Sequence, residues 1–248
     1  MHSFNEMVVP DEKIAIHWFG QNSFAIRDPQ GTVVLIDPYF PHQRPAEKFI
    51  QAEPPLDEAT LKTDLVLLTH DHGDHTCVES LQRTRAAFPE AVFVGPIESI
   101  DRLRDAGFPE EVLAIATAGA TLNVAGLTVH ATWSKPPEGA PEDGIRQPDV
   151  DHLGYVIAIG GVRVYVTGDM INTFADHADL VEAVAALKPE IGLLTMHPTE
   201  GEFPYFDGAV ELAVDLGLEA AVPAHYACFV KRTYDPYAWA AMLPEEGP

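Results

Sequence analysis

The chain has few basic residues. It contains 15 lysines and arginines against 38 aspartates and glutamates in 248 residues, which gives a formal net charge of −23 at pH 7. A protein that binds nucleic acid or an anionic membrane needs an excess of Lys and Arg to neutralise phosphate groups. The composition therefore argues against both kinds of partner and favours a small-molecule substrate, and it is compatible with a homo-oligomer.

Cysteines and long apolar runs are also scarce. Cys77 and Cys228 are too few for a disulfide framework, and we expect both to be buried small side chains. No run approaches the 18 or so consecutive apolar residues that cross a bilayer. The first six residues have neither the basic nor the apolar region of a secretory signal. We therefore expect a cytoplasmic protein.

What the chain does contain is the pattern of an α/β protein. Its hydrophobic content of 46% is that of an ordinary globular chain. Apolar runs of strand length alternate with segments of helical spacing, which predicts sheets covered by helices. No repeat, low-complexity tract or linker interrupts this pattern, so we expect one domain over residues 1–248. The expected strands are residues 14–18, 23–26, 33–37, 65–68, 91–95, 112–116, 121–133, 153–159, 162–167, 191–195 and 221–223, and the expected helices are residues 77–88, 97–106, 180–187, 210–216 and 235–243.

One stretch carries most of the chemistry. The apolar run 65–68 has the length and composition of a buried strand. Directly after it stands the pattern His-x-His-x-Asp-His, formed by His70, His72, Asp74 and His75. Imidazole nitrogens and carboxylate oxygens are ligands that suit Zn, Mn or Fe. The strand is therefore expected to act as a rigid support, and the loop at its end is expected to hold a metal site.

The spacing within this loop separates two pairs of ligands. His70 and His72 are two residues apart and can reach one cation. Asp74 and His75 are displaced from them by the turn at Gly73 and can reach a second cation. A loop with this spacing predicts a centre for two metal ions.

Two later strands also end in ligand-type residues. Asp169 follows Gly168 at the end of strand 162–167, and a glycine there lets the backbone turn sharply next to a metal. His225 follows the strand 221–223. We predict that Asp169 reaches the centre formed by the first loop.

Three polar residues near the start of the chain are further candidates. Asp37 ends an apolar strand just before Pro38, where it can either cap the following turn or take part in catalysis. Gln21 and Asn22 lie at a strand junction and are placed to face the site.

These motifs carry a resemblance to a known family. Residues 69–75 resemble the signature loop of the metallo-β-lactamase superfamily. Residues 165–169 and 221–226 resemble, in the same chain order, the later strands that end in a metal-bridging Asp and in the last ligand His. Residues 17–24 and 34–39 make the chain most similar to the L-ascorbate-6-phosphate lactonase group. The resemblance covers nearly the whole chain, and it implies a four-layer αββα sandwich.

The resemblance also implies how the ligands are shared. It predicts two divalent cations, Zn or Mn, with iron as a third candidate. It assigns His70 and His72 to the first cation, Asp74, His75 and His225 to the second, and Asp169 to a bridge between them.

Many members of the superfamily have a further His on the first cation, and here that region departs from the usual pattern. Two candidates remain. His152 lies where a long loop ends and a strand begins, whereas His130 lies inside a strand. We favour His152, because a side chain at the end of a loop can turn into a site.

A centre of this kind implies a metal-dependent hydrolase. Two cations about 3.5–4 Å apart lower the pKa of a shared water from 15.7 to about 7, which supplies hydroxide at neutral pH. Asp74 can guide or accept the proton in this reaction. The resemblance implies the opening of a lactone or related ester of a small sugar-acid-like substrate. A phosphodiesterase that uses the same two metals is the alternative, and a metal-binding module without turnover is a third hypothesis.

Three further residues are candidate substrate contacts. Lys135 and Arg146 belong to the Pro- and Gly-rich segment 134–151, which is either a lid over the substrate or a plain surface loop. His197 follows the strand 191–195 and either contacts the substrate or faces solvent.

Overall fold

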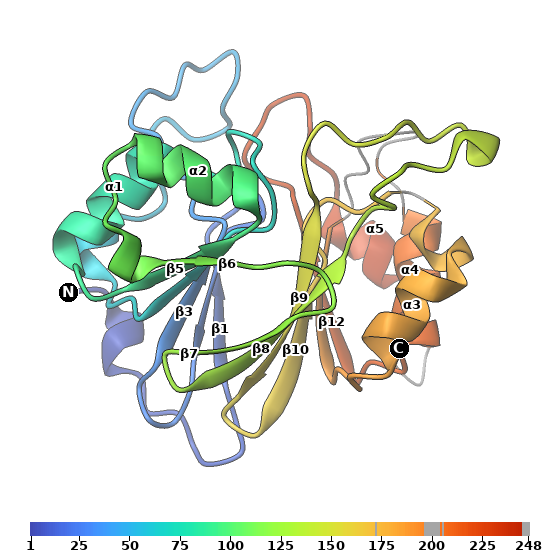
Figure 1. Cartoon of the computed structure of the whole chain (residues 1–248), viewed down its shortest axis with the longest axis horizontal. Coiled ribbons are helices and arrows are strands. Elements are labelled where there is room, and N and C mark those ends of the chain that lie inside the picture. Colours follow the sequence, from blue (N-terminus) through green and yellow to red (C-terminus); the bar gives the residue numbers. More distant parts are fainter. Residues whose placement is uncertain (172, 196–203, 205, 245–248) are drawn as a thin grey trace.

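The computed structural model describes residues 1–171, 173–195, 204 and 206–244. Two β-sheets pack face to face, and helices cover the outer face of each sheet (Figure 1). Helices α1 and α2 cover the first sheet, and α3, α4 and α5 cover the second. Within the described residues, no helix is both long enough and apolar enough to cross a membrane. The helices are α1 (Val78–Ala87), α2 (Ile97–Asp105), α3 (Ala178–Ala185), α4 (Phe206–Asp215) and α5 (Pro236–Ala240).

The first sheet has six strands in the order β1-β2-β3-β4-β5-β6. Its first three strands pair antiparallel, and β3 to β6 pair parallel. Strands β1 and β3 therefore run in the same direction. The strands are β1 (Ala15–Trp18), β2 (Phe24–Arg27), β3 (Val33–Ile36), β4 (Leu65–Leu67), β5 (Val92–Gly95) and β6 (Leu113–Ile115).

The second sheet also has six strands, in the order β12-β11-β10-β9-β8-β7. Here β7 to β10 pair antiparallel, and β10, β11 and β12 pair parallel. The strands are β7 (Thr121–Val124), β8 (Leu127–Trp133), β9 (Leu153–Ile159), β10 (Val162–Val166), β11 (Ile191–Thr195) and β12 (Ala220–Ala224).

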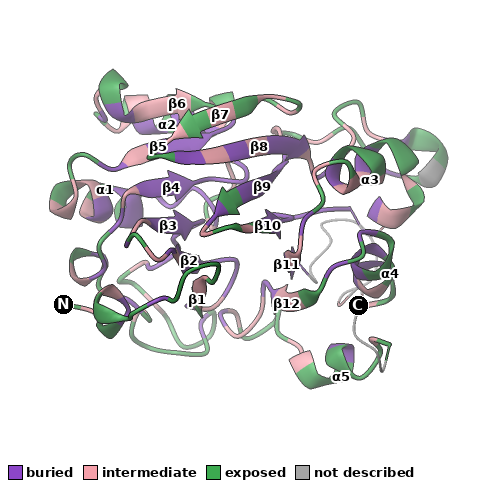
Figure 2. Ribbon diagram, turned by 90° about the horizontal axis from the view of Figure 1, so that it is seen from below, coloured by how far each residue is buried: buried purple, intermediate pink, exposed green. Residues whose placement is uncertain are grey.

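Strands β3 and β4 of the first sheet are apolar and buried at every position, because both of their faces are covered (Figure 2). In β3, Val34 and Ile36 point into the cluster between the two sheets. Val33 and Leu35 point the other way, into the cluster beneath the helices. Successive side chains of a strand alternate between its faces, so a strand buried on both faces needs an unbroken apolar run.

This architecture confirms the predicted αββα fold. The helices and strands fall close to their expected ranges, with differences at their ends. Of the expected strand 112–116, only Leu113–Ile115 is a strand, because Pro109 precedes a 3-10 turn at Glu110–Val112. The last helix is also shorter than expected and covers Pro236–Ala240.

Backbone hydrogen bonds join the two sheets along one edge of the sandwich. The Leu153 N–H, at the start of β9, donates to Thr69 O beyond β4 at 2.9 Å, and the Gln21 N–H beyond β1 donates to Tyr226 O beyond β12 at 3.0 Å. The segments that follow the parallel strands of both sheets therefore meet at this edge, which we call the joined edge. Ligands of α/β proteins bind where the carboxyl ends of strands meet in this way.

We predict that the packing between the sheets dominates stability. Leu67 of β4 is fully buried in the cluster between the sheets. Leu67→Ala should lower the free energy of unfolding by about 2–5 kcal/mol, because the cavity adds to the lost apolar burial. Urea denaturation measures this change. Ile115→Ala in the same sheet is the control, since that side chain is 45% exposed; equal losses in the two variants would contradict the prediction.

Candidate metal centre

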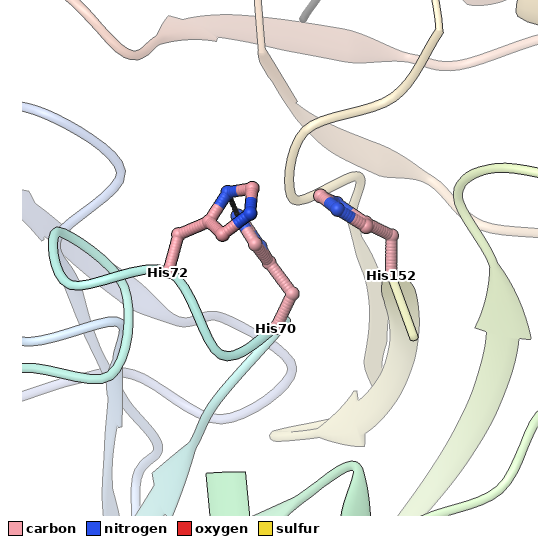
Figure 3. Close-up of side chains that lie close together, drawn as sticks. All are labelled: His70, His72 and His152. Carbon is pink, nitrogen blue, oxygen red and sulfur yellow. Dashed lines mark hydrogen bonds between the residues drawn. The ribbon is translucent and has the colours of Figure 1, made fainter. Parts of the chain in front are cut away.

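The first group of candidate ligands consists of His70, His72 and His152 (Figure 3). His70 Nε2 lies 3.1 Å from His72 Nδ1, and the His152 ring stacks on the His70 ring with centroids 4.0 Å apart. His70 and His72 follow β4, and His152 directly precedes β9. Their nitrogen atoms lie close enough to bind one ion. The structure therefore brings together the two members of the loop motif and the favoured third histidine.

The second group consists of Asp74, His75 and His225. His75 Nε2 lies 4.0 Å from Asp74 Oδ2, and His225 Nε2 lies 3.8 Å from the same oxygen. His225 directly follows β12 and is the residue that brings the second sheet into this group. The side chains of His75 and His225 are buried, whereas Asp74 is partly exposed and reaches the surface of the centre.

Asp169 lies between the two groups. Its Oδ2 is 3.8 Å from His70 Nε2, and its Oδ1 is 3.4 Å from His75 Nε2 and 3.5 Å from His225 Nε2. The preceding Gly168 has φ +63°, and a Cβ there would lie 2.8 Å from the Thr69 side chain. Only glycine lets the chain turn at this point without a clash. Asp169 thus faces both groups at once, as a bridging residue must.

Asp37 has a role that the sequence left open. Its Oδ2 accepts from His75 Nδ1 at 2.7 Å and from the Thr69 hydroxyl at 2.7 Å, and its Oδ1 accepts from the Thr69 N–H at 2.8 Å. Asn22 also donates to Oδ2, at 2.7 Å. A carboxylate on one nitrogen of an imidazole fixes the ring and directs its other nitrogen toward a metal. Asp37 therefore orients His75, and Asn22 helps to hold Asp37.

Burial controls the charge of two of the histidines. It lowers the pKa of His70 well below its ordinary value, and together with nearby Lys135 it lowers the pKa of His152 to about 3. Both rings are therefore neutral at pH 7 and keep a lone pair for a cation.

His75 and Asp169 form a coupled pair. Burial alone would lower the pKa of His75, but the carboxylates of Asp169 and Asp37 raise it well above its ordinary value. Burial alone would raise the pKa of Asp169, but His225 and His75 lower it well below its ordinary value. A proton on His75 balances these carboxylates, and a divalent cation in the same place would balance them instead.

The donor atoms fit a metal ion. Among the described residues, His75 Nε2, Asp169 Oδ1 and both ring nitrogens of His152 are buried and make no hydrogen bond. Buried polar atoms without partners are rare in folded proteins and point to a missing ion or water. Imidazole nitrogens together with carboxylate oxygens suit zinc, manganese or iron. The residues present can therefore hold metal ions of this kind.

Among the described residues, the other predicted site residues belong to none of the ligand groups. His130 in β8 is hydrogen-bonded to Thr121 Oγ1 at 2.8 Å and belongs to none of the ligand groups. Lys135 is buried and lines a separate cavity together with His152, and Arg146 is exposed on the loop 134–151. His197 lies outside the described residues. The substrate contacts assigned to Lys135, Arg146 and His197 stay predictions.

A cavity of about 630 Å³ opens beside Asp74. Three basic residues line it in a chain that is otherwise strongly acidic. Lys48 Nζ lies 5.2 Å and 5.3 Å from the ring centroids of Phe49 and Phe229, so this ammonium group rests against aromatic side chains. The lining residues are Tyr39, Glu47, Lys48, Gly73, Asp74, Phe229, Lys231 and Arg232.

Comparisons with known proteins agree with this geometry. A family model for the β-lactamase superfamily domain matches residues 32–226. A UPF0173 metal-dependent hydrolase from Methanopyrus kandleri is 30% identical over 236 residues, which are 94% of this chain and 92% of that protein. A UPF0173 metal-dependent hydrolase from Myxococcus xanthus is 30% identical over 223 residues, 88% of this chain and 72% of that protein.

Solved structures share the fold. An isothiocyanate hydrolase from Delia radicum gut bacteria superposes with a TM-score of 0.64 at 19% identity, over 95% of this chain and 97% of that one. CmlA, a diiron β-hydroxylase from Streptomyces venezuelae, superposes with a TM-score of 0.60 at 18% identity, over 94% of this chain and 49% of that one. At these identities the structures show a common fold alone. From the family model and the two relatives, we conclude that the chain belongs to the metallo-β-lactamase superfamily and, within it, to the UPF0173 metal-dependent hydrolases.

Proposed function

We propose that this metal-dependent hydrolase uses two metal ions to open a lactone, or to cleave a related ester, of a small acid of the sugar-acid type. The observation that supports two ions is the pair of ligand groups on either side of Asp169, which itself groups with one histidine of each, His70 and His75. His70, His72 and His152 would hold one ion. Asp74, His75 and His225 would hold the other.

The proposed roles follow from the chemistry of each group. When bound, two divalent ions bring the pKa of water near 7 and polarise a carbonyl or phosphoryl oxygen. Asp74 is the ligand-type side chain that also lines the cavity, so it is placed to take a proton from the attacking water. Asp37 keeps the His75 ring in one orientation, and Gly168 keeps Asp169 between the groups.

The charge of the cavity supports an acidic substrate. Lys48, Lys231 and Arg232 line it, opposed by Glu47 and by Asp74. The Asp74 charge would be balanced by a metal ion, which leaves the basic residues in excess. Tyr39 and Phe229 add flat apolar walls that suit a small ring. A lactone that carries a carboxylate or phosphate group matches both features, in keeping with the lactonase group that the sequence resembles.

Phosphodiester hydrolysis is the second candidate. The same basic residues would also bind the anionic oxygens of a phosphate diester. The two functions share the metal centre and differ in the substrates that are turned over.

We predict that His152 is a ligand of one metal ion and that His130 is not. Protein purified without added metal should contain close to two equivalents of Zn or Mn by inductively coupled plasma mass spectrometry. His152→Ala should reduce this toward one equivalent, because it removes a neutral buried nitrogen from the first group. His130→Ala is the matched control and should retain both ions, since its ring bonds to Thr121. Equal metal content in the two variants would count against the assignment.

We also predict that the basic residues of the cavity recognise an acidic group on the substrate. Lys48→Ala combined with Lys231→Ala should raise KM about 10-fold for a γ-lactone that bears a carboxylate, because charge-assisted contacts are lost. Hydrolysis of the same lactone without the carboxylate should not change. Kinetic assays of both lactones and of bis-p-nitrophenyl phosphate test the prediction.

The control for this experiment is Lys13→Ala combined with Lys62→Ala. These lysines precede β1 and β4 and lie at the opposite edge of the sheet, so the same charge is removed far from the cavity. A protein that cleaves bis-p-nitrophenyl phosphate and no lactone would instead be a phosphodiesterase. A metal-loaded protein that cleaves none of the three compounds would contradict both enzymatic functions.

A further inference from the structure

Gln21 has a side chain that the proposed centre does not yet account for. It lies between β1 and β2, is 1% exposed and points into the second ligand group. Its Nε2 is 2.7 Å from Asp74 Oδ2 and 2.7 Å from His225 Nε2. The amide therefore contacts two of the atoms that would bind the second ion.

The nitrogen and the oxygen of this amide differ in their hydrogen-bond contacts. The N–H groups of Gln21 face Asp74 Oδ2 and the His225 nitrogen. The amide oxygen, Oε1, is buried and has no hydrogen-bond partner among the described residues. A buried amide oxygen without a partner costs about 1–3 kcal/mol. An N–H group has no lone pair, so an ion held by Asp74 and His225 would face the end of the amide that cannot bind it.

A rotation of the amide by half a turn brings its oxygen to the end that faces the ion. The two ends of a glutamine amide are nearly identical in shape, so they exchange places without a change in packing. The oxygen would then stand 2.7 Å from Asp74 Oδ2 and from His225 Nε2, where the nitrogen stands now. Neighbouring ligand atoms of a tetrahedral ion bound at about 2.0–2.2 Å stand about 3.3–3.6 Å apart, so a shift of less than about 1 Å would let the ion enter.

We propose that Gln21 binds the second metal ion through its amide oxygen, and that the amide group rotates by half a turn when the ion binds. The inference rests on the proposed two-metal centre and adds a fourth side chain to Asp74, His75 and His225. An amide oxygen is a hard, neutral ligand of the kind that suits Mn and other oxygen-preferring ions. It completes the second group without adding to its negative charge.

The backbone holds Gln21 in place for this role. Its φ is +53°, in the left-handed region that glutamine rarely adopts. Its N–H donates to Tyr226 O at 3.0 Å, and its carbonyl accepts from the His225 N–H at 2.8 Å and from Trp18 Nε1 at 3.0 Å. The backbone of Gln21 is therefore hydrogen-bonded to the backbone of His225, which belongs to the second ligand group. A strained conformation with this much support is a mark of a functional position.

A simpler role would be hydrogen-bond donation to Asp74 alone. The two roles make opposite predictions for Gln21→Glu. A carboxylate at this position keeps the oxygen ligand, but it has no N–H to donate and would repel Asp74. A ligand role is therefore preserved by glutamate, whereas a donor role is not.

The experiment measures metal binding directly. Protein stripped with a chelator is titrated with Zn²⁺, and separately with Mn²⁺, in competition with a chromophoric chelator. The unsubstituted protein should bind two ions. Gln21→Ala should weaken binding of the second ion about 10–100-fold, as is typical when a group that supports a metal site is removed. The affinity for the first ion should not change. Gln21→Glu should bind the second ion at least as tightly as the unsubstituted protein.

Three controls keep the outcomes separate. Gln21→Asn retains the amide but is one methylene too short to reach the ion, so it should behave as Gln21→Ala does. Gln82→Ala on the exposed face of α1 should change nothing. Thermal unfolding and circular dichroism establish that each variant is folded.

Two results would overturn the inference while leaving the two-metal centre intact. One is an unchanged affinity for the second ion in Gln21→Ala. The other is binding by Gln21→Glu that is as weak as that of Gln21→Ala, which would make Gln21 a hydrogen-bond donor to Asp74. A single ion bound by the unsubstituted protein would overturn the two-metal centre and, with it, the inference.

Discussion

The structure depends on the balance of charge around one buried carboxylate. Asp169 is 4% exposed, and its oxygens lie between 3.4 and 3.8 Å from nitrogens of His70, His75 and His225. An unpaired carboxylate in such a place costs several kcal/mol of folding free energy. Positive charge must therefore stand among these side chains, as protons or as metal ions. Because protons and metal ions compete for the same nitrogens, metal binding and the stability of the joined edge are linked.

The backbone around the centre is strained at three positions. Gln21, Asp37 and His225 have φ values of +53°, +40° and +66°. A non-glycine residue in this region costs about 1–3 kcal/mol and persists only where its surroundings hold it. Each of the three directly follows a strand or lies between two strands at the joined edge. Hydrogen bonds between the sheets fix the backbone there, so the rigid sandwich supports conformations that the loops alone would not keep.

Much of this could be predicted from the sequence, because the signals are local. The apolar runs that end in His70, Asp169 and His225 identify both a buried strand and the ligand at its end. The strand pattern also bears on His130. Leu127, Val129 and Ala131 of β8 face the other sheet, so alternation places His130 on the opposite face, outside the layer between the two sheets.

What could not be predicted depends on contacts between distant parts of the chain. Asp37 is hydrogen-bonded to His75, 38 positions away, and nothing in either motif predicts this contact. The partial signal was that Asp37 ends one apolar run and His70 closely follows another; the structure pairs these runs in parallel, so both residues leave the sheet at the same edge. The basic cavity gave no such signal. Its residues lie on irregular segments without periodicity, which are joined by the hydrogen bond from the Val230 N–H to Lys48 O.

Binding of an anionic substrate in the cavity should depend on metal bound at the centre. A net charge of −23 repels an anionic substrate at long range, although salt limits this repulsion to about 8 Å at physiological ionic strength. Recognition of an acidic group must then rely on charges within that distance. Lys48, Lys231 and Arg232 supply some of them, and two divalent ions beside Asp74 would supply four more. In the metal-free protein, Asp74 would instead add negative charge beside the basic residues. Affinity for an anionic substrate should therefore depend on metal occupancy at least as strongly as on the basic residues, which would tie substrate binding to the loaded centre.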